Sequence, residues 1–104
     1  MDMAAQVYEQ SKRFPRAETY GLAAQLTRAA ASVPANIAEG NARGTAREYA
    51  HFLAVAKGSL VEAETFLLLA VRLNYLREED VAPTLGLITE VDKMLTSMRG
   101  KLSR

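Results

Sequence analysis

The chain has 104 residues, of which 49% are hydrophobic, with 13 basic and 12 acidic side chains, one histidine and no cysteine. This length and composition are typical of one soluble globular domain, so we treat residues 1–104 as a single domain. The lack of cysteine excludes disulfides, thiolate metal sites and cysteine nucleophiles. A net charge of +1 does not by itself indicate a nucleic-acid-binding protein.

Neither the start of the chain nor its longest apolar run indicates export or a membrane-spanning segment. The start of the chain, MDMAAQVYEQSKRF, lacks the apolar core of a signal peptide. The longest strongly apolar run, from Phe66 to Val71, is far too short to cross a membrane. We therefore expect a cytoplasmic protein with no membrane partner.

Helical signals dominate the chain, and prolines and glycines separate them. The first predicted helix spans residues 3–14, and Pro15 ends it. The second begins near Thr19, a suitable N-cap residue. It ends at a left-handed C-cap supplied by Gly40 or Asn41.

An apolar stripe in the second helix passes through Pro34 without losing phase. Its members are Leu22, Leu26, Ala29, Ala30, Val33 and Ile37. An interior proline costs roughly 3 kcal/mol, because it removes a hydrogen bond and clashes with the carbonyl four residues earlier. A true break would not preserve the phase, so we predict one continuous helix kinked at Pro34. Asn36 then has a structural role, either bonding loosened carbonyls or reaching across to another helix.

The third predicted helix starts at Thr45 and runs to about Tyr75. The sequence from Thr45 to Glu48 fits a capping box, S/T-x-x-E. Apolar residues then recur every seventh position in four columns, the last of which contains Ala54, Val61 and Leu68. One buried stripe needs fewer apolar residues, so we expect this helix to be covered from two directions.

The fourth predicted helix begins near Glu78 to Asp80, where acidic residues favour the positive end of the helix dipole. Its predicted buried face contains Val81, Leu85, Ile88, Leu95, Met98 and Leu102. A short loop between the second and third helices makes them antiparallel neighbours. The predicted fold class is all-α, an antiparallel up-down-up-down four-helix bundle whose first helix is too short to reach the end near Arg43.

Two long segments carry a family resemblance. They are YGL…QL.RAA.S.PANIAEG..R and REYAHFL..A.GSL.EAET…A.RL.YL, and the similarity extends from about Lys12 to the C-terminus. The chain resembles the 23S rRNA intervening-sequence proteins, also called the four-helix bundle protein family. Some relatives are encoded within inserted segments of ribosomal RNA genes. Others are accessory variability proteins of diversity-generating retroelements, in which a ring binds a reverse transcriptase and RNA.

The resemblance implies a kinked four-helix bundle that assembles into rings of five, with no enzymatic activity. This chain departs from the family in two ways. Relatives usually have a longer first helix that contains a tryptophan, and this chain has no tryptophan. The retroelement members are strongly basic, whereas this chain is nearly neutral.

Two motifs resemble ligand-binding signatures but are better explained by local helix structure. The segment AEGNARGTAREY is Gly-rich before a helix, but it lacks the Lys-Ser/Thr of a phosphate-binding loop, and no strand precedes it. Glu48 and His51 have the E-x-x-H spacing of di-iron bundles, which need a second such pair and two more carboxylates. One histidine cannot supply that set. We expect no metal, no cofactor and no catalytic residue.

Charged residues gather at one predicted end of the bundle. Glu39 lies near a helix C-terminus, where an acid is disfavoured, so we predict an ion pair with Arg43 or Arg47. The predicted basic pole contains Arg43, Arg47, Arg99, Lys101 and Arg104, against Glu39 and Glu48. These cations either complement helix dipoles in solvent or dock an acidic protein or a nucleic-acid backbone.

Glu62 and Glu64 lie close to the apolar columns of the third helix. The sequence leaves three alternatives open for them: they face solvent, they pair with Arg28 or Arg72, or they line a contact between subunits.

The sequence supports three functional hypotheses. The favoured one is a non-enzymatic assembly or adaptor module, a homo-oligomeric ring that binds a protein partner; the resemblance sets the expected number of subunits at five. The alternative is an RNA- or DNA-binding ring. The third, a metal-dependent enzyme, is disfavoured by the single histidine.

Overall fold

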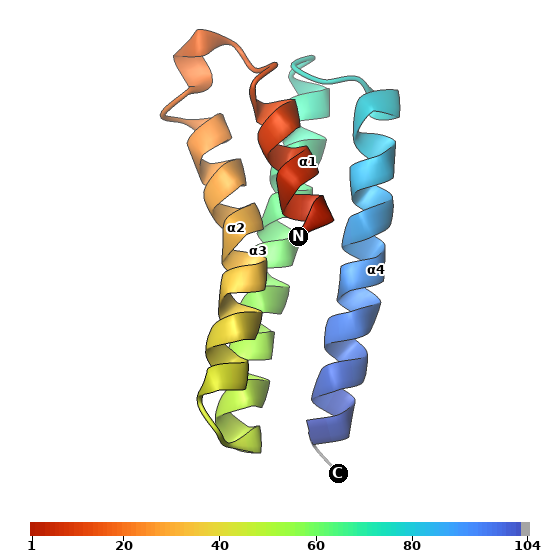
Figure 1. Ribbon diagram of the computed structural model, residues 1–104. Coiled ribbons are helices and arrows are strands. Elements are labelled where there is room, and N and C mark those ends of the chain that lie inside the picture. The colour runs from red at the N-terminus through yellow and green to blue at the C-terminus, as the bar shows by residue number, and fades with distance from the viewer. Residues whose placement is uncertain (103–104) are drawn as a thin grey trace.

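The computed structural model describes residues 1–102, and in that range it is a bundle of helices. The elements are α1 (Asp2–Ser11), the 3-10 helix η1 (Arg16–Glu18), α2 (Leu22–Ala42), α3 (Ala46–Arg72) and α4 (Glu78–Leu102). Figure 1 shows consecutive α-helices running in opposite directions, and residues 1–102 contain no strand. The predicted all-α four-helix fold class is confirmed.

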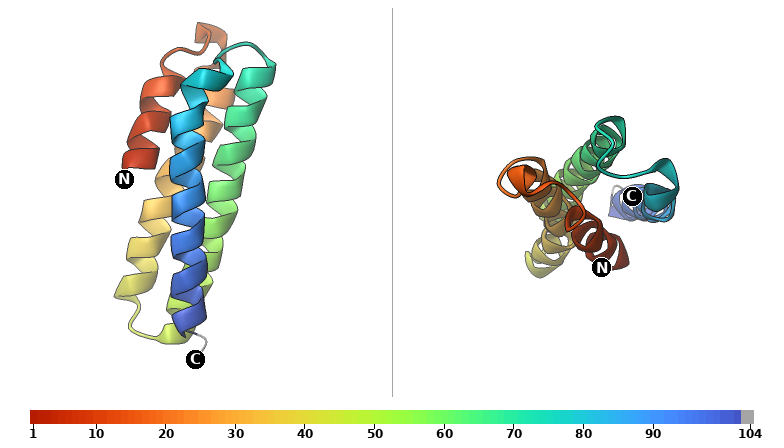
Figure 2. Two further views of the ribbon diagram at one scale, coloured as in Figure 1. Left: turned by 90° about the vertical axis from the view of Figure 1, so that its right-hand side faces the viewer. Right: turned by 90° about the horizontal axis from the view of Figure 1, so that it is seen from above.

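The first helix is much shorter than the others. At a rise of 1.5 Å per residue, the 10 residues of α1 extend about 15 Å, whereas the 21 residues of α2 extend about 31 Å. Figures 1 and 2 show α1 lying between α2 and α4. Its C-terminal end is near the α3–α4 loop, and its N-terminus is about halfway along the bundle. No Cα atoms of α2 and α4 come within 8 Å of each other. Beyond α1, the bundle therefore consists of α2, α3 and α4 alone.

The core is centred on α3. Leu53, Leu60 and Leu67 follow one another at intervals of seven residues and are at most 1% exposed. Beside them runs a row of buried alanines, namely Ala56, Ala63 and Ala70. Small side chains let helix backbones approach closely, and α2 and α3 form the most extensive helix pair in the bundle. Val7 of α1, Leu26 and Val33 of α2 and Leu95 of α4 belong to the same core.

The first helix ends earlier than the sequence predicts. It stops at Ser11, and the chain continues through turns in which Arg13 and Phe14 donate backbone hydrogen bonds three residues back. Phe14 is nevertheless buried, and its ring lies 5.5 Å from that of Tyr75. The apolar signal at Phe14 is therefore real, but it marks packing of a loop residue rather than helix.

The predicted N-cap at Thr19 is wrong. Thr19 ends η1, and α2 begins at Leu22 after Gly21. The backbone N–H of Leu22 donates to the Glu18 carboxylate at 3.4 Å. The other carboxylate oxygen of Glu18 accepts a hydrogen bond of 2.9 Å from the Tyr75 hydroxyl, which raises the pKa of Tyr75. The first backbone N–H of α2 is thus bonded by an acid four residues upstream. Tyr75 of the α3–α4 loop holds the carboxylate of this acid in place.

The predicted left-handed C-cap at Gly40 or Asn41 is also wrong. The helix α2 continues to Ala42, and Arg43 keeps a right-handed φ of −72°. The positive φ, +88°, falls at Gly44, which turns the chain towards α3. Gly40 instead lies inside the helix and is buried against Tyr49 and Phe52.

The third helix begins as predicted and ends early. Thr45 is the N-cap, and its hydroxyl oxygen accepts a hydrogen bond of 3.1 Å from the backbone N–H of Glu48. The helix stops at Arg72 rather than near Tyr75. Asn74 adopts a left-handed φ of 64°, a conformation that asparagine tolerates better than most residues. That turn carries Tyr75 back to contact Phe14 and Glu18.

The second helix continues through Pro34 without interruption. The bend expected there stays a prediction. Asn36 has the local structural role that the sequence allows: its amide nitrogen donates to the Ser32 carbonyl and the Ser32 hydroxyl, both at 2.8 Å. The Ser32 hydroxyl in turn lies 2.8 Å from that of Ser59 on α3. This polar chain links the proline-containing segment of α2 to α3.

A polar cluster that the sequence did not indicate joins α1 to α4. Thr84 is completely buried; its hydroxyl donates to the Gln6 side chain at 2.8 Å and accepts from the Gln10 amide at 2.9 Å. The same Gln10 amide also donates to the Asp80 carbonyl at 2.8 Å. On the predicted buried face of α4, Val81, Ile88 and Leu95 are buried, and Leu85, Met98 and Leu102 are partly buried.

The start of α4, at Glu78, agrees with the prediction, and Asp80 stabilises it. The Asp80 carboxylate accepts from the Arg77 backbone N–H at 3.0 Å and from the Arg77 guanidinium at 3.2 Å. The guanidinium of Arg13 lies 3.3 Å away on the other side. The backbone and side-chain bonds from Arg77, with a smaller effect of Arg13, lower the pKa of Asp80 from 3.8 to about 2.

We expect Asp80→Asn to reduce the free energy of unfolding at neutral pH. A carboxyl group whose pKa is lower in the folded protein stabilises the fold above its unfolded pKa of 3.8 and loses this effect as pH falls to about 2. Urea unfolding of both proteins across that range should show the gap between them closing with acid. A gap that stays constant would show that the charge of Asp80 does not stabilise the fold.

Candidate binding surfaces

The segments that carry the described residues of the predicted basic pole lie at one end of the bundle. Figures 1 and 2 show the α2–α3 loop and the C-terminal end of α4 at this same end, opposite η1. Arg43 pairs with Glu39 at 2.7 Å, as the sequence predicts. Its guanidinium also lies 5.0 Å from the centre of the Phe52 ring. Arg43 is therefore partly engaged by its own chain, although both members of the ion pair stay about half exposed.

The other described cations of the pole are exposed. Arg47, Arg99 and Lys101 all lie on the surface, and Glu48 beside them is exposed as well. Arg104, the fifth predicted member, lies outside the described residues. The binding of an acidic partner or a nucleic acid at this pole stays a prediction.

Glu48 and His51 take part in local structure. Glu48 lies in the first turn of α3, beneath its cap, and the His51 ring packs edge-on against Phe52 with 5.3 Å between ring centres. Within residues 1–102, no three His, Cys, Asp or Glu side chains are grouped so as to hold a metal ion.

The outer side of α3 exposes large apolar side chains, which we name the outer α3 face. Its members are Val61, Leu68 and Leu69 of α3 and the C-cap residue Leu73, each between 42% and 51% exposed. The sequence predicts cover for this helix from two directions. Within the chain, α2 and α4 pack against its buried side, whereas the outer α3 face stays about half exposed. Leu67 is fully buried, whereas its neighbour Leu68 is 51% exposed.

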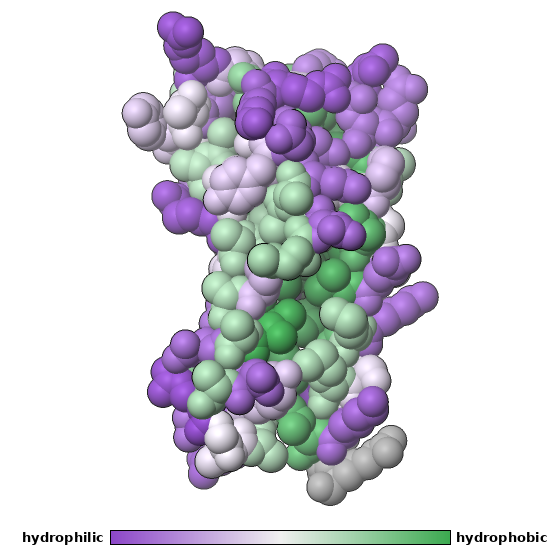
Figure 3. Space-filling view, viewed as in Figure 1, coloured by the Kyte–Doolittle hydropathy of each residue, from purple (hydrophilic) through white to green (hydrophobic). Residues whose placement is uncertain are grey.

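A second apolar surface lies on α2 and α4 beyond the N-terminal end of α1 (Figure 1), and we name it the α2–α4 face. It comprises Ile37 on α2 and the α4 stripe of Val91, Met94 and Met98, which are spaced by three and four residues. Met94 is 53% exposed, and the others are partly buried. Figure 3 shows apolar surface over the lower parts of these two helices. The four-helix bundle is thus incomplete on this side.

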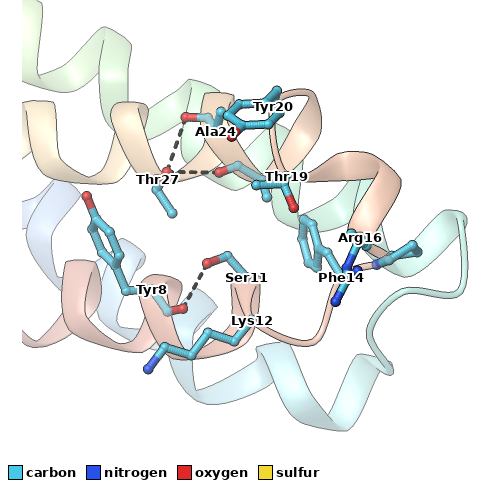
Figure 4. A pocket seen from close by; sticks show the side chains of 11 residues that line it. Tyr8, Ser11, Lys12, Phe14, Arg16, Thr19, Tyr20, Ala24 and Thr27 are labelled. Atoms are coloured by element: carbon cyan, nitrogen blue, oxygen red, sulfur yellow. Dashed lines mark hydrogen bonds between the residues drawn. The ribbon is translucent and has the colours of Figure 1, made fainter.

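At the end of the bundle opposite the basic pole, α1, η1 and α2 border a cavity of about 590 Å³ that is open to solvent (Figure 4). The sequence did not reveal it. Tyr8 and Lys12 of α1 line it on one side. Arg16 and Tyr20, from the connection between α1 and α2, line it on another. These four residues come together because Pro15 and η1 reverse the chain direction; the only signal in the sequence is the cluster of aromatic and basic residues around Pro15.

Glu62 and Glu64 lie on different flanks of α3. Glu62 is exposed and lines a shallow cavity with Arg28 and Ser59. Glu64 lines another with Lys57, which pairs with Asp92 of α4. Neither glutamate forms an ion pair within residues 1–102. Pairing with Arg28 or Arg72 is thus not observed, and a place at a subunit contact stays a prediction.

The fold and surfaces define a class of protein: an all-α four-helix bundle with unburied apolar faces. A family model described as "23S rRNA-intervening sequence protein" matches residues 1–97. The chain belongs to this family, whose description names no catalytic activity. The resemblance inferred from the sequence is thereby confirmed.

A solved structure shows the same fold. It is the crystal structure of a protein of unknown function from the S23 ribosomal protein family of Bacteroides thetaiotaomicron. It is 23% identical to this chain, with a TM-score of 0.86, over 94% of this chain and 92% of the other. No curated protein matches the chain. None of the helices in residues 1–102 combines the length and apolar character needed to span a membrane.

Proposed function

We propose that the protein is a non-enzymatic assembly module that forms a homo-oligomeric ring and binds a protein partner. The observation that carries this proposal is the pair of apolar surfaces that its own chain leaves uncovered, the outer α3 face and the α2–α4 face. Groups of exposed apolar side chains mark sites of protein association. The sequence motifs and the family supply no catalytic constellation to set against it.

Two different faces favour a ring over a simple dimer. A twofold dimer uses one self-complementary patch, so it would cover only one of them. A head-to-tail contact joins one face to the other on the next copy, and it closes into a ring if the rotation is suitable. The resemblance to the family suggests five subunits.

Light scattering on a size-exclusion column tests the proposal directly. We expect a mass several times that of one chain at micromolar concentration, and we expect Leu68→Glu to lower it towards the monomer. Ala35→Glu adds the same charge at an exposed position of α2, away from both faces, and should leave the mass unchanged. A wild-type monomer would refute the ring; a different number of subunits would refute only the stoichiometry.

The basic pole favours a second candidate, an RNA- or DNA-binding ring. A ring would repeat the exposed cations Arg47, Arg99 and Lys101 around its axis, and repeated weak patches give avidity that one patch lacks. Binding through phosphates weakens steeply as salt rises. A fluorescently labelled single-stranded RNA therefore tests it at low and high salt.

We expect the combined change of Arg43, Arg47 and Arg99 to Glu to abolish any low-salt RNA binding. Circular dichroism and light scattering should show unchanged helicity and mass. If the wild-type protein binds no RNA at low salt, the nucleic-acid candidate fails and the protein-partner proposal stands.

A further inference from the structure

We propose that the cavity between α1 and α2 binds a short anionic peptide segment that carries an aromatic side chain. The proposal rests on the proposed function in one respect, that a protein partner exists; it adds where that partner docks and what its segment contains. The site lies at the opposite end of the bundle from the basic pole, so the two surfaces can be tested separately.

The cavity has the size and framework of a binding site. Its volume of about 590 Å³ lies in the usual range for ligand pockets, roughly 300–1,000 Å³. Two helices form opposite walls, with Tyr8 on α1 and Ala23, Ala24 and Thr27 on α2. The buried Phe14 and the rigid Pro15 belong to the connection between the two helices and line the cavity as well. The bundle holds the two helical walls, and the contact of Phe14 with Tyr75 anchors the connection to it.

Two tyrosine rings border the cavity with much of their surface in solvent. Tyr8 is 49% exposed, and Tyr20 is 95% exposed, so the Tyr20 ring is hardly covered by its own chain. Figure 4 shows Tyr8 on the α1 side and Tyr20 on the α2 side, with Thr27 and Ala24 drawn between them. Aromatic rings supply large contact area at low entropic cost and prefer offset or edge-to-face partners. An aromatic side chain seated in the cavity would cover ring surface that the chain leaves in solvent.

The charges that line the cavity are all positive. Lys12 and Arg16 lie on its rim, and no Asp or Glu lines it. Arg16 forms no ion pair within residues 1–102. Lys12 pairs with Glu9 at 3.1 Å, but both side chains are at least 70% exposed, so this pair is easily exchanged. The cavity therefore attracts a carboxylate.

The hydroxyl groups suit a peptide backbone. The Ser11 hydroxyl donates to the Tyr8 carbonyl at 2.8 Å, and the Thr27 hydroxyl donates to the Ala23 carbonyl at 2.9 Å. Figure 4 shows these bonds on opposite walls of the cavity. Since both hydrogens are already used, the two oxygens are left as acceptors, and a peptide N–H is the matching donor.

A nucleic-acid strand fits the same cavity less well. Single strands are held by a groove that tracks successive phosphates with cations. Here the only cations that line the cavity are Lys12 and Arg16, and Glu9 pairs with Lys12. A short peptide needs only one or two carboxylates at this point. Charge thus favours the peptide.

The test uses the pentapeptide acetyl-Glu-Glu-Phe-Glu-Glu-amide and nuclear magnetic resonance of the isotopically labelled full-length protein. We expect concentration-dependent shifts of backbone amides around Tyr8, Lys12, Arg16 and Tyr20. Tyr20→Ala should weaken binding at least tenfold, and Arg16→Glu should abolish it. Arg72→Glu, which makes the same charge change on an exposed position of α3, should bind as the wild type does.

Two further peptides define the chemistry. The version with Lys in place of Glu and the version with Ala in place of Phe should both fail to shift these amides. The proposal is overturned if the acidic peptide leaves the cavity unperturbed, if the basic version binds equally well, or if single-stranded RNA shifts the same amides more strongly. Light scattering on the same samples reports the ring independently, so loss of the peptide site and loss of the proposed assembly are distinguished.

Discussion

Leu67→Ala is expected to lower the free energy of unfolding by about 2–5 kcal/mol, the usual cost of truncating a fully buried leucine. Leu67 is 0% exposed and lies in the row with Leu53 and Leu60 at the centre of the bundle. Truncation removes apolar contacts and leaves a cavity, because a helix packed against both α2 and α4 relaxes only partly. Urea unfolding at matched protein concentration measures the loss.

Leu68→Ala is the matched control, since it makes the same change at the next residue. Leu68 is 51% exposed, so its truncation opens no cavity, and surface changes usually alter stability by less than about 0.5 kcal/mol. In light scattering, we expect Leu68→Ala to weaken association and Leu67→Ala to spare it wherever the protein remains folded. Equal effects of the two variants on both measurements would contradict the separation of core from assembly face.

The sequence alone marks both leucines as apolar columns of one helix and predicts cover from two directions. It does not say which column faces the core and which lies outside. That choice depends on where α2 and α4 pack, and the lengths of the helices do not determine it. The structure places the Leu67 column inside and leaves the Leu68 column uncovered.

Helix number, order and approximate extent were predictable because apolar periodicity is a property of the helix itself. The exact ends of the helices were less predictable. Thr19 is a good N-cap by type, yet Glu18 accepts the first N–H of α2 because Tyr75, far along the chain, holds its carboxylate. Tertiary contacts overrode the local preference. The pair of Arg43 with Glu39 was predictable because it is a contact between residues four apart on one helix.

The cavity between α1 and α2 was not predictable in the same way. Tyr8 and Tyr20 belong to different segments, and only the reversal of the chain at Pro15 and η1 puts them around one space. Neither residue has a partner at helical spacing that would signal a site. The basic pole was easier to predict because antiparallel topology alone brings helix ends together.

Gly40→Ala is the second change with a large expected effect. A Cβ atom at position 40 would lie 2.8 Å from the Cβ of Phe52 and 3.0 Å from the Tyr49 ring. The Tyr49 carbonyl oxygen would be 3.3 Å away. Because two of these atoms are fixed to the α3 backbone, the clash can be relieved only by moving the two helices apart.

Two opposing effects decide the result. Alanine favours a helix interior over glycine by roughly 1 kcal/mol, whereas overpacking a tight contact typically costs about 1–3 kcal/mol. We expect overpacking to win, since α2 and α3 share the largest helix contact and the strain would spread along it. Urea unfolding should therefore show Gly40→Ala to be less stable than the wild type.

Gly86→Ala is the control that isolates the contact from the helix propensity. Gly86 also lies inside a helix, α4, and nothing lies within 4 Å of a Cβ atom built there. It should gain stability, by roughly 0.5–1 kcal/mol. If both alanine variants were stabilised alike, the α2–α3 spacing would be adjustable at Gly40; opposite signs would show that this glycine is required by the close approach of α2 and α3.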